Sequence, residues 1–169
     1  RQPLLYNIFV TRTEGFATAM EEMMMREGFL DRHPRSDELI YELVAERAAR
    51  ALGDLYLHSN AFTMAQAKQF AVSQTPRGWL RASSATVNGE QHLYLQQPAY
   101  GTSYVIGKIQ FDELLSERAA QLGAAYTTKR FMDEFNAAGL IPMSLIRWQL
   151  TGNPDEIIAM TRPEPAAAR

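Results

Sequence analysis

Apolar residues recur every three to four positions along nearly the whole chain, which is the spacing of one face of an α-helix. The pattern predicts an all-α fold, a multi-helix bundle, with helical stretches at residues 4–27, 36–55, 63–73, 98–123, 127–139 and 142–152. We expect one helical domain over residues 1–162 and a disordered tail over residues 163–169.

The clearest predicted helix begins near Ser36. This serine suits the N-cap position, and Asp37 and Glu38 suit the positive end of the helix dipole. Further along the chain, Thr63 and Gln66 have the spacing of a capping box at the start of a shorter helix. The helix from Ser36 carries one continuous apolar stripe that we expect to face the core, made of Ile40, Leu43, Val44, Ala48, Ala51, Leu52 and Leu55.

Residues 75–97 allow two interpretations. The pair Asn88-Gly89 is typical of a two-residue β-hairpin turn. However, no neighbouring segment offers a further strand, and a lone hairpin is marginally stable in water. We therefore favour a helix or a loop here. In the next stretch, Gly101 and Gly107 either permit close helix packing or weaken the helix, at about 1 kcal/mol each relative to alanine.

Composition and charge narrow the functional classes. The chain has 169 residues, of which 46% are hydrophobic, so it can bury a real core. Its 17 basic and 19 acidic residues are well mixed, which disfavours a nucleic-acid partner. The absence of cysteine excludes disulfides, thiolate metal sites and cysteine nucleophiles. No apolar run approaches the ~20 residues of a membrane span. Because the chain opens with Arg1, we interpret it as a cut piece of a longer polypeptide; its compartment stays open.

Glu14 is the first candidate functional residue. Residues 4–20 contain only this carboxylate and the guanidinium of Arg12, so a helix here is expected to be covered by protein on most sides. A buried carboxylate needs a hydrogen-bonded cation, a metal ion or a proton. Arg12 is two positions away, and residues at that spacing point away from each other on a helix. We therefore expect a group from elsewhere to neutralise Glu14.

Three segments resemble, in the same order, a bacterial family known as domain of unknown function 885. TEGFATAMEEMMMREGF resembles the family's Glu-Gly-Trp-Ala helix. QQPAYGTSYVIGKIQFDELLSERAAQLG resembles its Pro-Gly-Gln…Ser-Tyr-Lys-Ile-Gly-Lys segment, and RFMDEFNAAGLIPMSLI resembles its Arg-Glu-Phe-His…Gly-x-x-Pro-Leu pattern. The resemblance spans about Glu14 to Gly152. Members of the family look like zincin-type metallopeptidases.

The resemblance implies the C-terminal helical half of a zinc peptidase-like protein acting on peptides. The family's zinc motif, a helix with His-Glu and a second His, would lie on a missing upstream half, so this chain alone is not expected to bind zinc. Glu14 matches the glutamate that would be the third ligand. Tyr104 matches the family's Ser-Tyr tyrosine, which could donate to the oxyanion, and Tyr100 lies one helical turn earlier. His92 and Tyr94 are candidate substrate contacts.

Each candidate also has a plainer interpretation. Glu14 could be an exposed or ion-paired helix residue, Tyr104 could simply pack on an apolar stripe, and His92 could be an ordinary surface histidine. We expect His58 to interact with the helix dipole, and Trp148 to be a packing anchor. No complete catalytic or metal motif occurs in the chain.

The chain also departs from the family pattern. The family's tryptophan is Phe16, its Pro-Gly-Gln is Pro98-Ala99-Tyr100, its lysine is Val105, and an arginine is replaced by Leu93. A second hypothesis is therefore a non-catalytic member or a helical peptide-binding module. An unrelated helical bundle, with Glu14 in solvent, is a third. If an upstream half is missing, its removal exposes the first helix, which could then mediate self-association.

Overall fold

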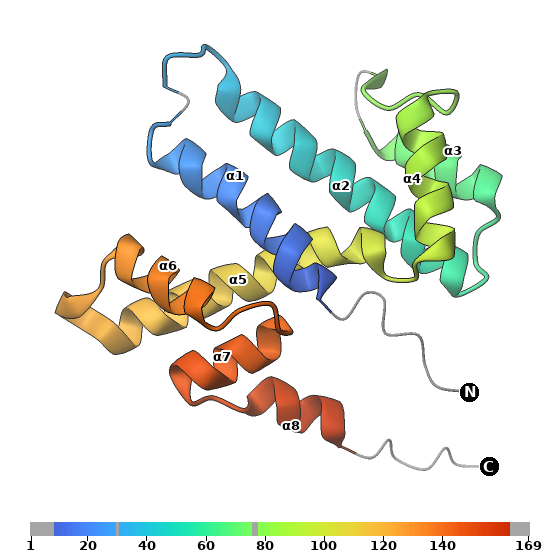
Figure 1. Ribbon diagram of the computed structural model, residues 1–169. Helices are drawn as coiled ribbons and strands as arrows, with labels where there is room; N and C mark the ends of the chain where they lie inside the picture. Colours follow the sequence, from blue (N-terminus) through green and yellow to red (C-terminus); the bar gives the residue numbers. More distant parts are fainter. Residues whose placement is uncertain (1–8, 30, 76–77, 163–169) are drawn as a thin grey trace.

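The computed structural model describes residues 9–29, 31–75 and 78–162, and these residues form helices and no strand (Figure 1). The predicted all-α class is confirmed. The predicted start of the first helix at residue 4 and the predicted tail at 163–169 lie outside the described residues. The elements are η1 (Thr11–Gly15), α1 (Phe16–Arg26), α2 (Ser36–His58), α3 (Met64–Gln74), α4 (Ala85–Gln96), α5 (Tyr100–Leu122), η3 (Gly123–Ala125), α6 (Thr128–Ala137), α7 (Met143–Thr151) and α8 (Asp155–Thr161).

Helix α5 is the centre of the arrangement. Its first half packs against α2 and η1, and its second half packs against α7 and α6. Figure 1 shows α3 and α4 beside one end of α2, and α6, α7 and α8 grouped along the far part of α5. Residues from η1, α2, α4 and α5 therefore meet around the start of α5.

Local sequence signals explain most helix boundaries. The predicted capping box of α3 is present, with the Thr63 hydroxyl accepting from the Gln66 N–H and the Gln66 side chain accepting from the Thr63 N–H. Residues 85–96 form helix α4, as the favoured interpretation predicts, with the Ser84 hydroxyl as N-cap. Asn88 and Gly89 lie inside that helix, so the hairpin alternative is wrong.

Two predicted helix starts are off by one residue. Ser36 is the first residue of α2 rather than its N-cap, which is Arg35 in a left-handed conformation. Pro142 is the N-cap of α7 rather than its first residue. A further helix, α8, follows Pro154 and was not predicted. Its acidic first turn is held by tertiary contacts, because Glu156 pairs with Arg147 and accepts from Gln110.

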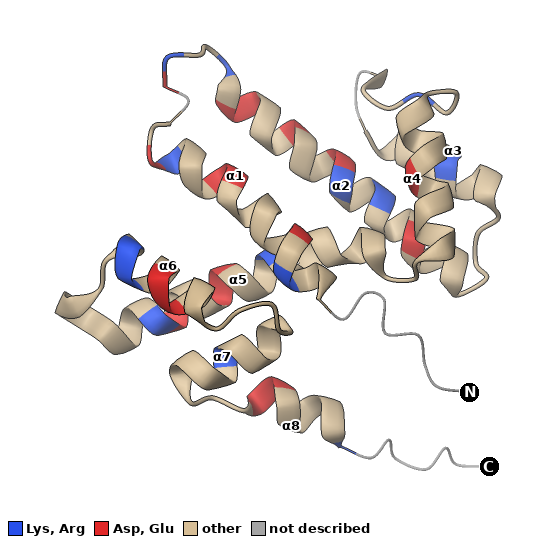
Figure 2. Cartoon of the chain, in the orientation of Figure 1, with Lys and Arg blue, Asp and Glu red and all other residues tan. Residues whose placement is uncertain are grey.

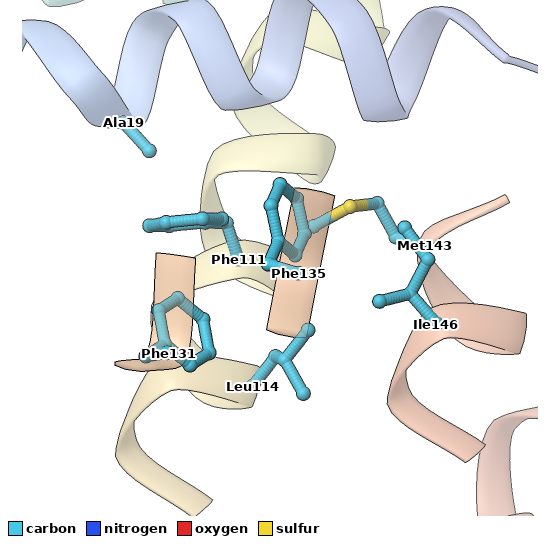
Figure 3. Close-up of a cluster of buried hydrophobic side chains, with 7 residues drawn as sticks. All are labelled: Ala19, Phe111, Leu114, Phe131, Phe135, Met143 and Ile146. Carbon is cyan, nitrogen blue, oxygen red and sulfur yellow. The ribbon is translucent and has the colours of Figure 1, made fainter. Parts of the chain in front are cut away.

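The main hydrophobic core lies between α1, α5, α6 and α7 (Figure 3). The ring centroid of Phe111 lies 5.5 Å from that of Phe131 and 5.1 Å from that of Phe135, both in edge-to-face geometry. Trp148 is 49% exposed, so its predicted role as a packing anchor is wrong. The buried members of this core are Ala19, Phe111, Leu114, Phe131, Phe135, Met143 and Ile146.

The buried face of α2 differs from the predicted apolar stripe. Leu52 and Leu55 are 42% and 52% exposed, whereas Arg50 and Asp54 are 7% and 1% exposed. Of the seven residues of the predicted stripe, Ile40 and Ala51 are buried, Leu43, Val44 and Ala48 are partly buried, and Leu52 and Leu55 are exposed. In the second half of α2, Arg50 pairs with Glu90 of α4, and Asp54 accepts a hydrogen bond from Thr102 of α5. This part of α2 therefore buries polar side chains against two other helices.

Positively and negatively charged residues are interspersed along the helices (Figure 2). Several pair between neighbouring elements and tie them together: Arg47 with Glu21, Lys108 with Glu22, Arg118 with Glu134, and Arg147 with Glu117. No helix of the described residues is both long and apolar enough to cross a membrane, as expected from the sequence.

Candidate functional site

Glu14 lies in a turn of π-helix, η1, that leads directly into α1. Such turns are rare and occur often at functional sites. Gly15, the last residue of the turn, packs against Gly107 of α5. A β-carbon on Gly107 would lie 2.8 Å from Cα of Gly15, so only glycine permits this approach. The contact confirms the close-packing alternative for Gly107, and it brings Glu14 beside the start of α5.

The carboxylate of Glu14 accepts a hydrogen bond of 2.6 Å from the phenol of Tyr100, and both side chains are partly buried. Among the described residues, no lysine, arginine or histidine forms an ion pair with Glu14. Arg12 points elsewhere, as expected, and donates to Asn136. Glu14 is therefore a half-buried carboxylate whose described partner is a neutral phenol.

Three tyrosine rings lie in a row, Tyr94, Tyr100 and Tyr104, and the carboxylate bonds the middle one. The Tyr100 ring centroid lies 5.8 Å from that of Tyr104, and 6.1 Å from that of Tyr94 on the neighbouring helix α4. Burial raises the pKa of all three phenols; the hydrogen bond to Glu14 raises that of Tyr100 further, and the charge of Glu14 that of Tyr104. These phenols therefore stay protonated and can act as hydrogen-bond donors.

Arg47 of α2 lies beside the Tyr104 ring, at one end of the three tyrosines. The sequence did not indicate it as a candidate site residue. Its guanidinium carbon lies 5.7 Å from the centroid of the Tyr104 ring. It donates to both carboxylate oxygens of Glu21, at 2.5 and 2.8 Å. The hydrogen bonds that Arg47 donates to Glu21 raise the pKa of its guanidinium, and the negative charge of Glu14 adds to this effect. Arg47 is thus a permanent positive charge beside the tyrosines.

A second polar cluster lies behind Tyr94. Its phenol donates to Glu90 at 3.4 Å, and Glu90 pairs with the buried Arg50. Arg50 also pairs with Glu46 at 3.6 Å. Burial raises the pKa of the Glu90 carboxyl, while Arg50 opposes the shift. Two carboxylates therefore surround one guanidinium in the interior, and this cluster fixes α4 against α2.

Asp54 holds the start of α5 in place. Its carboxylate accepts from the backbone N–H of Thr102 at 3.2 Å, so it caps a helix to which it does not belong. His58 lies 3.4 Å from the same carboxyl group and donates to the backbone carbonyl of Tyr94 at 2.9 Å. Gly101 leaves room for Asp54 and the Tyr94 ring, since a β-carbon there would lie 3.0 Å from that ring. His58 therefore bridges elements and does not merely end its own helix.

Comparison with known proteins places the chain in a family. Residues 3–150 match the sequence model of the family described as bacterial protein of unknown function, DUF885. The chain belongs to the DUF885 family. A search of curated proteins finds no significant match.

The fold of the DUF885 chain is also similar to a crystal structure described as that of "the putative lipoprotein from Colwellia psychrerythraea". The TM-score is 0.74 at 24% sequence identity, and the match covers 87% of this chain. It covers 24% of that chain, so the DUF885 chain spans about a quarter of the length of this protein. At this identity the likeness concerns the fold alone.

The structure brings together four of the five predicted site residues of the DUF885 chain. Glu14, Tyr100, Tyr104 and Tyr94 lie next to one another as described. His92 is exposed, and its ring donates to the backbone carbonyl of Asn88 on its own helix. No described contact joins His92 to the other four, and its substrate role stays a prediction.

The DUF885 chain offers little else for metal binding. In the ranges that the structure covers, no group of three or more histidine, cysteine, aspartate or glutamate side chains is placed to hold a metal ion. Glu14 fits the chemistry of a single carboxylate ligand, because it has a free acceptor capacity and a hydrogen-bonding partner that fixes its orientation.

Proposed function

We propose that this chain is the C-terminal helical part of a zinc-dependent peptidase, in which Glu14 supplies one metal ligand. The observation that carries the proposal is the half-buried Glu14 carboxylate in a π-helical turn. It accepts a hydrogen bond from the Tyr100 phenol and has no cation as a described partner. Ligating carboxylates in metal sites are held by such second hydrogen bonds. The remaining ligands and the general base would come from a segment upstream of this chain.

The roles of the chain's own residues follow from their placement. Tyr100 would orient the Glu14 carboxylate through their hydrogen bond. The protonated phenol of Tyr104, whose ring contacts that of Tyr100, would donate a hydrogen bond to the oxyanion of the tetrahedral intermediate. Tyr94 is 1% exposed and its phenol bonds Glu90, so it would support the Tyr100 ring from behind and would not touch the peptide as the sequence-based hypothesis had it. Zinc, when bound, would lower the pKa of a water molecule and polarise the scissile carbonyl.

Metal content tests the ligand role. The full-length protein should purify with about one zinc per chain, and Glu14→Gln should lose it. Tyr100→Phe should bind zinc about 10-fold to 100-fold more weakly, because the carboxylate is no longer oriented. Glu117→Gln is a matched control, because that glutamate pairs with Arg147 away from the site and should retain zinc.

Elemental analysis and circular dichroism of the same preparations provide the measurement. Unchanged zinc content and peptidase activity in Glu14→Gln would refute the proposal. A wild-type protein that binds peptide but neither binds zinc nor cleaves peptide would support the second hypothesis, a non-catalytic peptide-binding module.

A further inference from the structure

We propose that Arg47 binds the C-terminal carboxylate of the peptide, so that the substrates are peptides with a free C-terminus. This inference rests on the proposed function and adds a substrate class to it. Its basis is the position of the guanidinium beside Tyr104, whose ring contacts that of Tyr100, the hydrogen-bond partner of Glu14.

The charge balance around the site favours Arg47 over Arg50 as the anion-binding group. Arg50 is paired with both Glu46 and Glu90, and its side chain is 8% exposed. Arg47 has one described carboxylate partner, Glu21, and its side chain is 18% exposed. The two terminal nitrogens of Arg47 each donate one hydrogen bond to Glu21. Because a guanidinium carries five N–H donors, Arg47 retains donors for a second anion.

The pairing of Arg47 with Glu21 and not with Glu14 favours a substrate carboxylate over the oxyanion. Arg47 forms no ion pair with Glu14, and its side chain reaches the site on the side of the Tyr104 ring. An oxyanion at a metal held by Glu14 would lie next to that carboxylate, whereas a terminal carboxylate lies farther along the peptide. Glu21 holds the guanidinium in a fixed orientation, which pre-organises it for a planar carboxylate.

Equilibrium binding tests this role without requiring the metal. The probes are a tripeptide with a free C-terminal carboxylate and the same tripeptide with a C-terminal amide, titrated calorimetrically into the full-length protein in EDTA. Wild type should bind the acid about 10-fold to 100-fold more tightly than the amide, the usual effect of one charged hydrogen-bonded pair. Arg47→Met should remove that preference and leave amide binding unchanged.

Two further variants separate binding from a structural role. Glu21→Gln breaks the same ion pair between α1 and α2 but keeps the guanidinium, so it should weaken the preference for the acid far less than Arg47→Met does. Arg118→Met removes a similarly exposed ion pair with Glu134 outside the site, and it should retain the preference. Arg47→Lys, which keeps the charge but not the planar fork, should retain part of it.

The outcomes are distinct from those of the metal test. Equal wild-type affinity for acid and amide, or an acid preference that persists in Arg47→Met, would overturn the proposal. Equal losses in Arg47→Met and Glu21→Gln would also overturn it, because the ion pair would then act only through the structure. An acid preference that depends on Arg47 in a protein that never binds zinc would support this inference while the peptidase proposal fails.

Discussion

The backbones of Gly15 and Gly107 lie directly against each other where η1 crosses α5. A β-carbon on Gly15 would lie 2.9 Å from the backbone nitrogen of Lys108 and nearer still to Gly107 itself. This crossing joins a residue next to Glu14 with the helix that carries Tyr100 and Tyr104. The geometry of the candidate site therefore depends on two positions that have no side chain.

Alanine at Gly107 should destabilise the protein by about 1–3 kcal/mol, because its methyl group would overlap backbone atoms of η1 that cannot move independently. Gly89→Ala is the matched control, since that helical glycine has no neighbouring atom within 4 Å of the new methyl group. This control should raise stability by up to about 1 kcal/mol through helix propensity. Urea unfolding measures both. Equal effects of the two substitutions would contradict the packing assignment.

Asp54 should make stability depend on pH. Burial is the main cause that raises the pKa of its carboxyl above the unfolded value of 3.8, so the folded state holds the proton more tightly. Its contribution to stability is then present below the unfolded pKa and is lost as pH rises through the folded pKa. Asp54→Asn keeps an acceptor for the Thr102 N–H but cannot titrate.

The measurement is the difference in unfolding free energy between wild type and Asp54→Asn across this pH range. Wild type should lose stability relative to the variant as pH rises from about 4, the unfolded value of an aspartate. A difference that is constant with pH, or that changes in the opposite direction, would show that burial does not control this carboxyl.

Phe135→Ala should cost about 3–5 kcal/mol, because this fully buried ring packs against Phe111, Phe131 and Phe16. Trp148→Ala removes a larger side chain, but this residue is 49% exposed and should cost about 1 kcal/mol. Thermal or urea unfolding of the two variants provides the comparison. A larger loss at Trp148 would mean that the core is centred elsewhere.

Arg12 and Asn136 should be energetically coupled. The Arg12 guanidinium lies 4.0 Å from the Phe135 ring centroid and 4.8 Å from that of Phe16, and it donates to the Asn136 amide oxygen. Burial lowers the pKa of Arg12, so every polar partner matters. Asn136→Ala should cost about 1–3 kcal/mol in wild type and less in an Arg12→Met background. A double-mutant cycle checks this; equal costs in both backgrounds would exclude the coupling.

The sequence predicted much of the secondary structure because its signals are local. The capping box of Thr63 and Gln66 and the helical stop at Gly139 act within one or two turns, and the structure has both. The errors are also instructive. Helix α8 is too short to show a periodic apolar pattern, and it is held by tertiary contacts of Glu156, so the sequence did not predict it.

The candidate site was only partly predictable. Glu14 was predicted first as the lone carboxylate of an apolar segment, and Tyr104 came from the resemblance to a family. Tyr100 was added because it lies one turn earlier, and it meets Glu14 across 86 positions of sequence. Arg47 was not nominated, because a charged residue on an amphipathic helix usually faces solvent. Arg50 lies outside the predicted apolar stripe of α2, yet it is buried, and its partner Glu90 lies on a helix for which the sequence also allowed a loop or a hairpin.

The sequence by itself determined the all-helical class, the family and most helix limits, because apolar periodicity, caps and breakers act between neighbouring residues. Only the tertiary structure decided which face of α2 is buried, that Gly15 touches Gly107, and that the Tyr100 phenol reaches Glu14. These relationships depend on how helices far apart in the sequence cross. The energy of such a crossing depends on the surfaces of both helices, so it cannot be inferred from either segment alone.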